Sequence, residues 1–268
     1  MEKAIDTFIE DLIRRRNAHT KADLSKGLHS LFQGLSEANL QTFLSSSHIV
    51  ETEEGQEITA QGDDATYLFY ILKGSVKTQR FNSDGKEATI RMLGAGETFM
   101  EDAIFIGSKS PVYAITTRDS RLLMIPAETV RRRALSDPQL ACNLMKILSR
   151  HYKNAIQQID SIVTKSPVER LGYYFLKLHM EQGSDSMDIA LPFQKSTIAN
   201  HLGITPETFS RALSQIKKIG IDVDHEKLTL RDAYALCHFC DADMATDCHR
   251  FNTPDCHLCP DKKHKNCH

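Results

Sequence analysis

Apolar residues near the start of the chain recur at helical spacing. Over residues 4–16 they fall on one stripe, and acidic and basic residues occupy the other faces. This pattern predicts an amphipathic helix within an N-terminal extension, residues 1–27. The stripe consists of Ile5, Phe8, Ile9, Leu12 and Ile13.

Between residues 28 and 125 the pattern changes to short apolar runs separated by turn residues. Lys73 with Gly74, and the Asn-Ser-Asp-Gly sequence at 82–85, are turn signals that bracket one such run. Many short strands at regular spacing are typical of a β-sandwich or jelly roll. We therefore expect a β-roll domain over 28–125. Its predicted strands are 67–72, 75–81, 89–93, 112–117 and 121–125.

A long helix is predicted after Pro126. Between Pro138 and Val163 there is no further Gly or Pro, and apolar residues recur at spacings of three and four. The length and the narrow stripe favour an intersubunit coiled coil, so we assign residues 126–165 to a dimerisation helix. The alternative is a helix that packs on its own β-roll. The stripe is formed by Leu144, Leu148, His151, Ala155, Ile159 and Ile162.

Residues 166–236 contain three helical segments followed by a short β tail. Residues 197–202 form a short helix that ends at a glycine, and Thr205 and Pro206 are a favoured N-cap and first residue for the next helix. Residues 221–230 alternate about a polar turn, which suits a two-stranded wing. Helix, tight turn, helix and hairpin is the order of a winged helix-turn-helix. The predicted inner face of the third helix is Phe209, Leu213 and Ile216.

Composition is that of a globular protein with room for two domains. The chain has 268 residues, of which 41% are hydrophobic and 25% charged. The formal net charge of −2 is not that of a typical nucleic-acid binder, but duplex DNA responds to local Lys and Arg clusters rather than to the total. Residues 1–18 lack a signal-peptide core, and no eighteen apolar residues run together. We expect a cytoplasmic protein without a membrane partner.

The order of β-roll, long helix and winged helix-turn-helix resembles the CRP/FNR family of transcription regulators over residues 28–236. The most specific part is Ile-Ala-Asn-His-Leu-Gly-Ile-Thr-Pro-Glu-Thr-Phe-Ser-Arg at 198–211. This string, with residues 96–105 and 111–114, is most similar to the Dnr-type branch, whose members respond to nitric oxide. The resemblance implies a homodimer that binds double-stranded DNA, with RNA polymerase as a candidate partner. We expect an α+β fold: an N-terminal β-roll (jelly-roll) sensor domain, a long dimerisation helix, a C-terminal winged helix-turn-helix and a Cys-rich tail.

Three polar residues lie on one face near the start of the predicted recognition helix. Ser210 and Arg211 follow Glu207 by three and four residues. Glu can accept from cytosine N4, Arg can grip guanine O6 and N7, and Ser can contact a base or a phosphate. Glu-x-x-Ser-Arg is also the FNR-type arrangement, so the resemblance implies palindromes with half-sites like TTGAT. Further candidate DNA contacts are Lys195, Thr197, Thr208, Lys217 and Lys218.

The sensor domain departs from the pattern of cyclic-nucleotide relatives, in which a Gly-Glu pair and a later Arg-Ser pair hold the phosphate. Glu101 falls at the Glu position, but Met100 replaces the Gly, and residues 111–112 are Pro-Val where Arg-Ser would be. A buried phosphate needs a cation and backbone donors. Lys109 could partly substitute, so a cyclic nucleotide remains the alternative effector. The N-terminal cysteines that carry the FNR cluster are absent, because the first cysteine is Cys142.

Haem with bound nitric oxide is the effector that the Dnr-type resemblance implies. Haem iron needs an axial His, Met or Cys and an apolar pocket. The branch carries a His in a segment similar to the one that starts at His29, and it can have a His where this chain has His179. The candidate haem ligands are His29, His179, Met100 and His151.

The C-terminal tail, residues 237–268, contains an internal repeat. Cys-x-x-Cys, seven residues and Cys-His occur twice, and corresponding cysteines are 19 residues apart. The spacing Cys-x2-Cys-x15-Cys-x2-Cys is typical of tetrahedral zinc sites, and six thiolates could also hold an iron–sulfur cluster. Either the two Cys-x-x-Cys pairs share one metal, or each repeat closes its own site; the alternative is an unligated tail. The candidate ligands are Cys237, Cys240, Cys248, His249, Cys256, Cys259, Cys267 and His268.

The sequence favours a DNA-binding regulator over three other kinds of function. An enzyme controlled by a β-roll is disfavoured, because no nucleophile–base set, phosphate loop or spare domain is evident. A metal-buffering protein would bind Zn or Fe through the tail without specific duplex affinity. A regulator that senses metal or redox state through the tail would keep the DNA-binding function and add an input.

Overall fold

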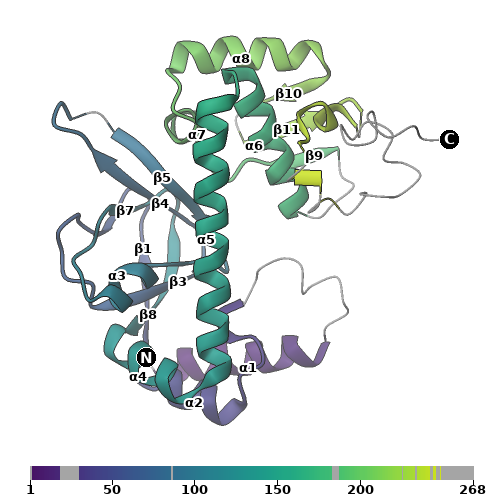
Figure 1. Cartoon of the computed structure of the whole chain (residues 1–268). Helices are drawn as coiled ribbons and strands as arrows, with labels where there is room; N and C mark the ends of the chain where they lie inside the picture. The colour runs from purple at the N-terminus through teal and green to yellow at the C-terminus, as the bar shows by residue number, and fades with distance from the viewer. Residues whose placement is uncertain are drawn as a thin grey trace. The chain divides into compact units, whose positions relative to one another are not determined.

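The computed structural model describes residues 2–18, 30–85, 87–182, 187–224, 226–232, 234–241, 244, 245 and 248. The chain divides into two compact units, Met1–Ile156 and Gln157–His268, and the boundary falls inside one long helix, α5 (Pro138–Thr164) (Figure 1). The first unit is built on two β-sheets and the second on a helix-turn-helix, so the expected α+β fold is confirmed. Among the described residues, no helix is both long and apolar enough to cross a bilayer.

The first unit contains two four-stranded sheets whose neighbouring strands pair antiparallel. Their strand orders are β1-β8-β3-β6 and β2-β7-β4-β5. The five predicted strands correspond to β3, β4, β5, β7 and β8, while β1, β2 and β6 were not predicted. The last two have three and two residues, too few to show an alternating pattern. The strands are β1 (His48–Thr52), β2 (Glu57–Thr59), β3 (Tyr67–Lys73), β4 (Ser75–Phe81), β5 (Glu87–Gly94), β6 (Thr98–Phe99), β7 (Tyr113–Thr116) and β8 (Ser120–Pro126).

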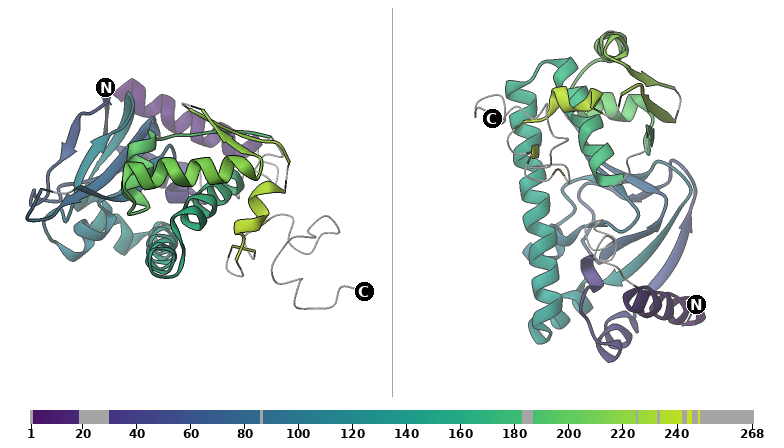
Figure 2. Two further views of the ribbon diagram at one scale, coloured as in Figure 1. Left: turned by 90° about the horizontal axis from the view of Figure 1, so that it is seen from above. Right: turned by 90° about the vertical axis from the view of Figure 1, so that its right-hand side faces the viewer.

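The stretch expected to form one dimerisation helix is two helices, α4 (Ala127–Ser136) and α5. Asp137 separates them in an extended conformation, because the residue before a proline is pushed out of the helical region. Its carboxylate accepts from the backbone amides of Gln139 and Leu140 at 3.0 and 3.2 Å and so caps α5. From there α5 runs unbroken to Thr164 (Figure 2).

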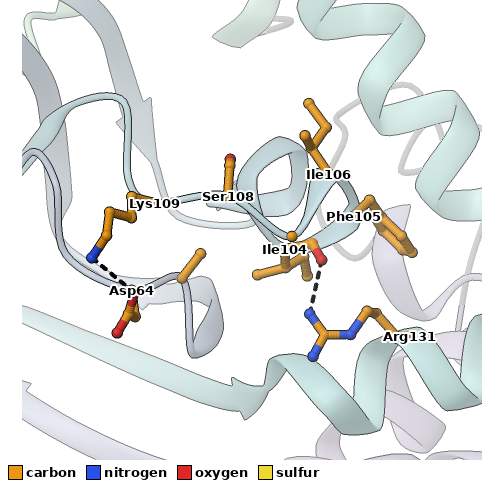
Figure 3. A pocket seen from close by; sticks show the side chains of 9 residues that line it. Asp64, Ile104, Phe105, Ile106, Ser108, Lys109 and Arg131 are labelled. Atoms are coloured by element: carbon orange, nitrogen blue, oxygen red, sulfur yellow. Dashed lines mark hydrogen bonds and ion pairs between the residues drawn. The ribbon is translucent and has the colours of Figure 1, made fainter.

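A surface pocket of about 520 Å³ lies where α3 (Glu101–Ile106) meets α4 and the loop before β3. Arg131 of α4 donates from Nη1 to the carbonyl of Ile104 at 2.9 Å and thereby ties the two helices together (Figure 3). Across the pocket, Lys109 pairs with Asp64 at 3.1 Å. The charged groups of this pocket are therefore already engaged with the protein.

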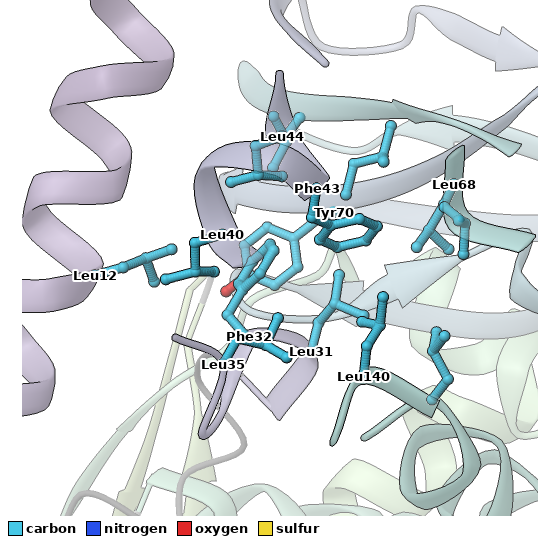
Figure 4. Packing of buried hydrophobic residues seen from close by; sticks show 14 of the residues in the cluster. Leu12, Leu31, Phe32, Leu35, Leu40, Phe43, Leu44, Leu68, Tyr70 and Leu140 are labelled. Atoms are coloured by element: carbon cyan, nitrogen blue, oxygen red, sulfur yellow. The ribbon is translucent and has the colours of Figure 1, made fainter. Parts of the chain in front are cut away.

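The predicted N-terminal helix is confirmed as α1 (Glu2–Ala18), which packs into the main core of the first unit. Its residues Ile5, Ile9 and Leu12 are buried there, and each apolar side chain buried in this way contributes about 1.5–3 kcal/mol. The Phe32 ring meets Tyr70 of β3 edge-on with centroids 5.0 Å apart (Figure 4). The core also receives side chains from η2 (Ser30–Phe32), α2 (Glu37–Leu44), α4 and the start of α5.

The predicted coiled-coil stripe of α5 was wrong in its first half. Leu144 is only 2% exposed because it packs, with Leu140 and Ile147, in the core of the first unit. The first half of α5 therefore packs on the β-roll of its own chain, which was the alternative to a coiled coil. The exposed apolar row shares only Ile159 with the predicted stripe and has spacings of seven, four, three and four. Its members are Met145 (60%), Tyr152 (70%), Ile156 (48%), Ile159 (60%) and Val163 (77%).

The second unit has the predicted order of helices and hairpin, and it adds one strand. A three-stranded sheet in the order β10-β11-β9 includes β9, which was not predicted. The β10–β11 hairpin lies beside the last long helix, α8 (Figure 2). The elements are α6 (Pro167–Gln182), β9 (Asp188–Ala190), α7 (Lys195–His201), α8 (Pro206–Lys218), β10 (Ile221–Val223), β11 (Lys227–Leu230) and η3 (Ala235–Phe239).

Candidate functional site

The turn between α7 and α8 is fixed by local backbone chemistry. Gly203 adopts a positive φ of 64°, which costs a glycine little, and the following Ile204 amide donates to the carbonyl of Ala199 at 3.1 Å. Thr205 then caps α8, since its hydroxyl accepts from the Thr208 amide at 3.3 Å. The start of α8 is therefore held in a defined position.

The rotation of α8 about its axis is set by a buried face. Phe209, Ala212 and Ile216 are at most 4% exposed, while Leu213, also predicted to face inward, is half-buried. The opposite face is open. The structure brings the three predicted base-reading residues together on it, and all are exposed: Glu207, Ser210 and Arg211.

The charges on this exposed face suit donors and acceptors on base edges. Hydrogen bonding to its own backbone amide, then to the Thr205 hydroxyl, lowers the pKa of Glu207, and the nearby Arg211 charge adds to the effect. Glu207 is thus an ionised acceptor, while Arg211 only donates. One helix turn carries complementary groups for a cytosine and a guanine.

The other predicted DNA contacts are placed less favourably for reaching a duplex. Thr197 is buried, at 7% exposed, and the Thr208 hydroxyl lies 3.1 Å from the capping hydroxyl of Thr205. Lys195 is half-buried, with Nζ 3.5 Å from a backbone carbonyl of β10. Lys217 and Lys218 are exposed, and the first pairs with an acidic side chain of β10 at 3.1 Å.

A buried charged cluster lies inside the β-roll. Glu101, the first residue of α3, is 1% exposed, and its Oε1 lies 3.0 Å from Nη1 of Arg91 on β5. The same oxygen lies 2.5 Å from Nδ1 of His151 on α5. Arg91 Nη2 donates to the carbonyl of Thr98 at 3.0 Å and lies 2.7 Å from Nε2 of His151. Because Arg can only donate, Nε2 of His151 is the acceptor in this contact.

These contacts keep the Glu101 carboxylate ionised. Burial alone would raise the pKa of Glu101, but the hydrogen bond with His151 and the positive charge of Arg91 outweigh it and hold the pKa below its ordinary value. Oε2 of Glu101 has no hydrogen-bond partner among the described residues. The buried carboxylate of Glu101 is thus stabilised by Arg91 of β5 and His151 of α5, two elements that are far apart in the sequence.

The segment that would hold a cyclic phosphate lacks a free cation. Met100 keeps a left-handed backbone, φ 76°, which is unusual for a residue with a side chain, and that side chain is 4% exposed in the core. Pro111 and Val112 offer no charge, and Lys109 pairs with Asp64. The arrangement does not favour a cyclic nucleotide.

The predicted haem ligands do not form an open site among the described residues. Both ring nitrogens of His151 contact the charged cluster, and Met100 packs in the core, where the Ser110 hydroxyl lies 3.6 Å from its sulfur. His179 is buried on α6 of the other unit. His29 lies outside the described residues, and the haem prediction stays a prediction.

Three of the predicted tail ligands are described: Cys237 and Cys240 on or next to η3, and Cys248. In the part of the chain that the structure describes, three or more metal-ligating side chains do not gather at one point. The remaining predicted ligands lie outside it: His249, Cys256, Cys259, Cys267 and His268.

Sequence reasoning did not identify Arg91 as a site residue. It pairs in register with Thr78, which is 3% exposed and lies on the inner face of the roll. Side chains opposite each other on paired strands point to the same face. The signal that could have identified Arg91 was its charge at an inward-facing position of a predicted strand.

Comparisons with known proteins agree with this architecture. Residues 49–137 match the family described as "Cyclic nucleotide-binding domain", and residues 169–239 match "Crp-like helix-turn-helix domain". The two matched regions coincide with the β-roll and the winged helix-turn-helix. They therefore correspond to a sensor domain and a DNA-binding domain.

Curated transcription regulators align with about two thirds of the chain. The "cAMP-activated global transcriptional regulator CRP" of Haemophilus influenzae is 25% identical over 193 residues, 70% of this chain and 85% of the relative. The "Fumarate and nitrate reduction regulatory protein" of Vibrio cholerae is 28% identical over 169 residues, 62% of this chain and 67% of the relative. The structure of FixK2 from Bradyrhizobium japonicum has the same fold, with a TM-score of 0.64 and 22% identity over 71% of this chain and 95% of FixK2.

These relatives are regulators rather than enzymes, and they share the sensor and helix-turn-helix domains with this chain. The exposed face of α8 is the part of the described chain best suited to DNA. This chain belongs to the CRP/FNR family of DNA-binding transcription regulators.

Proposed function

We propose that this regulator binds FNR-like palindromic DNA, with half-sites similar to TTGAT, through the exposed face of α8. The observation that carries the proposal is the exposure of Glu207, Ser210 and Arg211 on a helix whose opposite face is anchored by Phe209 and Ile216. An α-helix fits the major groove, and residues near its N-terminus reach base edges. Bidentate Arg–guanine contact and a Glu–cytosine contact supply direct readout.

The protein acts as a homodimer in this proposal. The exposed row from Met145 to Val163 repeats at the three-and-four spacing of a coiled-coil seam. A two-fold dimer presents two copies of α8, and this matches the symmetry of a palindrome. We expect this regulator to act in the cytoplasm, with RNA polymerase as a candidate partner.

The effector of the β-roll is a small molecule in this proposal. Nitric oxide at a haem follows from the Dnr-type resemblance, with His29, His179, Met100 or His151 as the candidate axial ligand. A cyclic nucleotide is the second candidate, but Arg91 and His151 already contact Glu101, and Lys109 already pairs with Asp64. Reconstitution with haemin would give a shifted Soret band that responds to nitric oxide, and calorimetry with cAMP tests the second candidate.

Fluorescence anisotropy at one fixed salt concentration tests DNA binding. A duplex with a TTGAT palindrome should bind at least about 10³-fold more tightly than a scrambled duplex. Equal affinity for both duplexes would contradict the proposal. A protein whose main role is metal buffering would show this equal, weak binding.

A further inference from the structure

The first Cys-x-x-Cys of the tail forms a tight turn in the second unit, and both of its cysteines are thiols in the structure. The Cys240 amide donates to the carbonyl of Cys237 at 3.2 Å, which closes the turn. In a turn closed in this way, the first and fourth Cα atoms lie within about 7 Å of each other. A disulfide joins residues whose Cα atoms are about 4.4–6.8 Å apart. The turn therefore has a suitable size for a disulfide between its two cysteines.

The two thiols differ in their access to solvent. Cys237 is half-buried, whereas Cys240 is 9% exposed and its Sγ lies 3.6 Å from the carbonyl oxygen of Asp241. Reaction with a small oxidant needs an accessible sulfur, but the step that completes a disulfide needs only a neighbouring thiol. Cys237 is thus placed to react first and Cys240 to resolve the intermediate.

Phe239, between the two cysteines, fixes the turn to α6. A Cβ built on Gly172 of α6 would lie inside the van der Waals radius of the Phe239 ring, so only a glycine lets the ring approach so closely. Gly172 is itself buried within α6. The thiol pair therefore has a defined position on the helix that begins the DNA-binding domain.

Asp241, directly after Cys240, contacts the link between α5 and α6. Its Oδ2 lies 3.0 Å from Nζ of Lys165, whose side chain is 17% exposed. Nζ of Lys165 also lies 3.4 Å from Oδ2 of Asp160 on α5 and 4.9 Å from the centre of the Tyr173 ring on α6. One lysine thus connects the turn to both helices.

We propose that Cys237 and Cys240 form a reversible disulfide, and that this bond stabilises the docked turn on α6 and makes DNA binding sensitive to redox state. The bond would close the same four residues that the backbone hydrogen bond already closes. A cross-link there removes alternative conformations of the segment and so favours the docked turn. Because α6 contacts both η3 and α8, the effect reaches the recognition helix across one packed contact.

The oxidant is a low-molecular-weight disulfide such as oxidised glutathione. The Cys237 thiolate attacks one of its sulfurs, which forms a mixed disulfide and releases one small thiolate. The Cys240 thiolate then attacks the Cys237 sulfur, closes the protein disulfide and releases the second small thiolate. Two protein thiols are thus oxidised, the small disulfide is reduced to two thiols, and the two cysteine protons pass to these products through solvent. Excess small thiol reverses both steps.

Peptide mass analysis of the full chain tests the disulfide. The protein is equilibrated without oxygen in mixtures of glutathione and its disulfide, with a chelator so that no metal protects the thiols, and is then alkylated. Cleavage before aspartate releases residues 232–240, which contain no cysteine besides this pair. We expect this peptide to lose two hydrogen atoms as the share of glutathione disulfide rises, and dithiothreitol should restore both thiols.

Variants test the order of the two steps. Cys240→Ser should accumulate the mixed disulfide with glutathione on Cys237, because the resolving thiol is gone. Cys237→Ser should leave the buried Cys240 largely unmodified. Cys248→Ser is the matched control and should oxidise like the wild type. A pair that stays reduced in glutathione disulfide alone, or that joins Cys248 instead, would overturn the inference.

Hydrogen exchange at the α6 amides of residues 168–176 tests the stabilised turn. We expect oxidation of the wild type to slow this exchange by at least about 3-fold. Phe239→Ala should still form the disulfide but lose the slowing, because the ring no longer contacts α6. Asp241→Asn is a milder variant that removes the charge facing Lys165 and should reduce the slowing. Equal exchange in the two redox forms of the wild type would contradict the proposed effect on α6.

The redox effect on DNA rests on the proposed DNA-binding function and is measured by the affinity of oxidised and reduced protein for the TTGAT palindrome. We expect the two forms to differ by at least about 5-fold, and Phe239→Ala should bring this ratio close to one. Equal affinity of the two wild-type forms would overturn the redox input. If neither form prefers the palindrome, the DNA proposal fails, while peptide mass and hydrogen exchange still test the disulfide and its effect on α6.

Discussion

Nδ1 of His151 lies 2.5 Å from Oε1 of Glu101, so α5 is joined to the inside of the β-roll through a buried carboxylate. Glu101 occupies the Glu position of the phosphate-binding segment in the family pattern. In this protein the chain compensates that carboxylate with His151 and Arg91. The contact therefore links the sensor domain to the helix that carries the proposed dimer seam.

His151→Ala should destabilise the protein by about 1–3 kcal/mol, because a buried carboxylate loses one of two partners. Denaturant unfolding of the purified variant measures the change. Lys146→Ala, an exposed position on the same helix, is the control and should change the free energy of unfolding by less than about 0.5 kcal/mol. Similar losses in both variants would show that the buried contact has no special role.

The lowered pKa of Glu101 predicts a specific acid sensitivity. A carboxylate whose pKa is lower in the folded state stabilises that state, and the full contribution is present above the ordinary pKa of 4.5. The contribution is lost as the pH falls through the pKa of the folded state. The free energy of unfolding should therefore drop below pH 4.5 more steeply in the wild type than in Glu101→Gln. Parallel curves for the two proteins would contradict the ionised, compensated state of Glu101.

Arg211→Ala should cost about 1–3 kcal/mol of discrimination at one guanine of the half-site. Anisotropy titrations with duplexes altered one base at a time measure the loss. Lys218→Ala is a useful contrast, since a phosphate contact should weaken binding to all sequences and reduce the salt slope by about one. An equal loss for Arg211→Ala on cognate and scrambled duplexes would remove its base-reading role.

Replacement of both Ile156 and Ile159 with Glu should convert the dimer to a monomer, because four like charges would meet at the seam. Sedimentation velocity measures the mass, and affinity for the palindrome should fall with it. Arg150→Glu changes an exposed residue of α5 outside the exposed apolar row and should leave the dimer intact. A double variant that stays dimeric would place the dimer interface elsewhere.

The start and the exposed face of the DNA-binding helix α8 could be predicted from nearby residues alone. Thr205 and Pro206 fix its start, and Phe209 with Ile216 fixes its inner face, so the exposure of Glu207 and Arg211 follows from helical geometry alone. These signals lie within a dozen residues of one another. For the same reason the amphipathic helix α1 and the strands β3, β4, β5, β7 and β8 were predicted from their patterns.

Two features were decided only by the tertiary structure. The α5 sequence is apolar on more than one face, and periodicity cannot tell which face meets the core, so Leu144 was placed in the seam although it packs in the roll. Arg91, Glu101 and His151 come from a strand, a short helix and the long helix, up to 60 residues apart. Their meeting depends on how the sheets fold around them, because a buried carboxylate is tolerated only where long-range packing brings its partners.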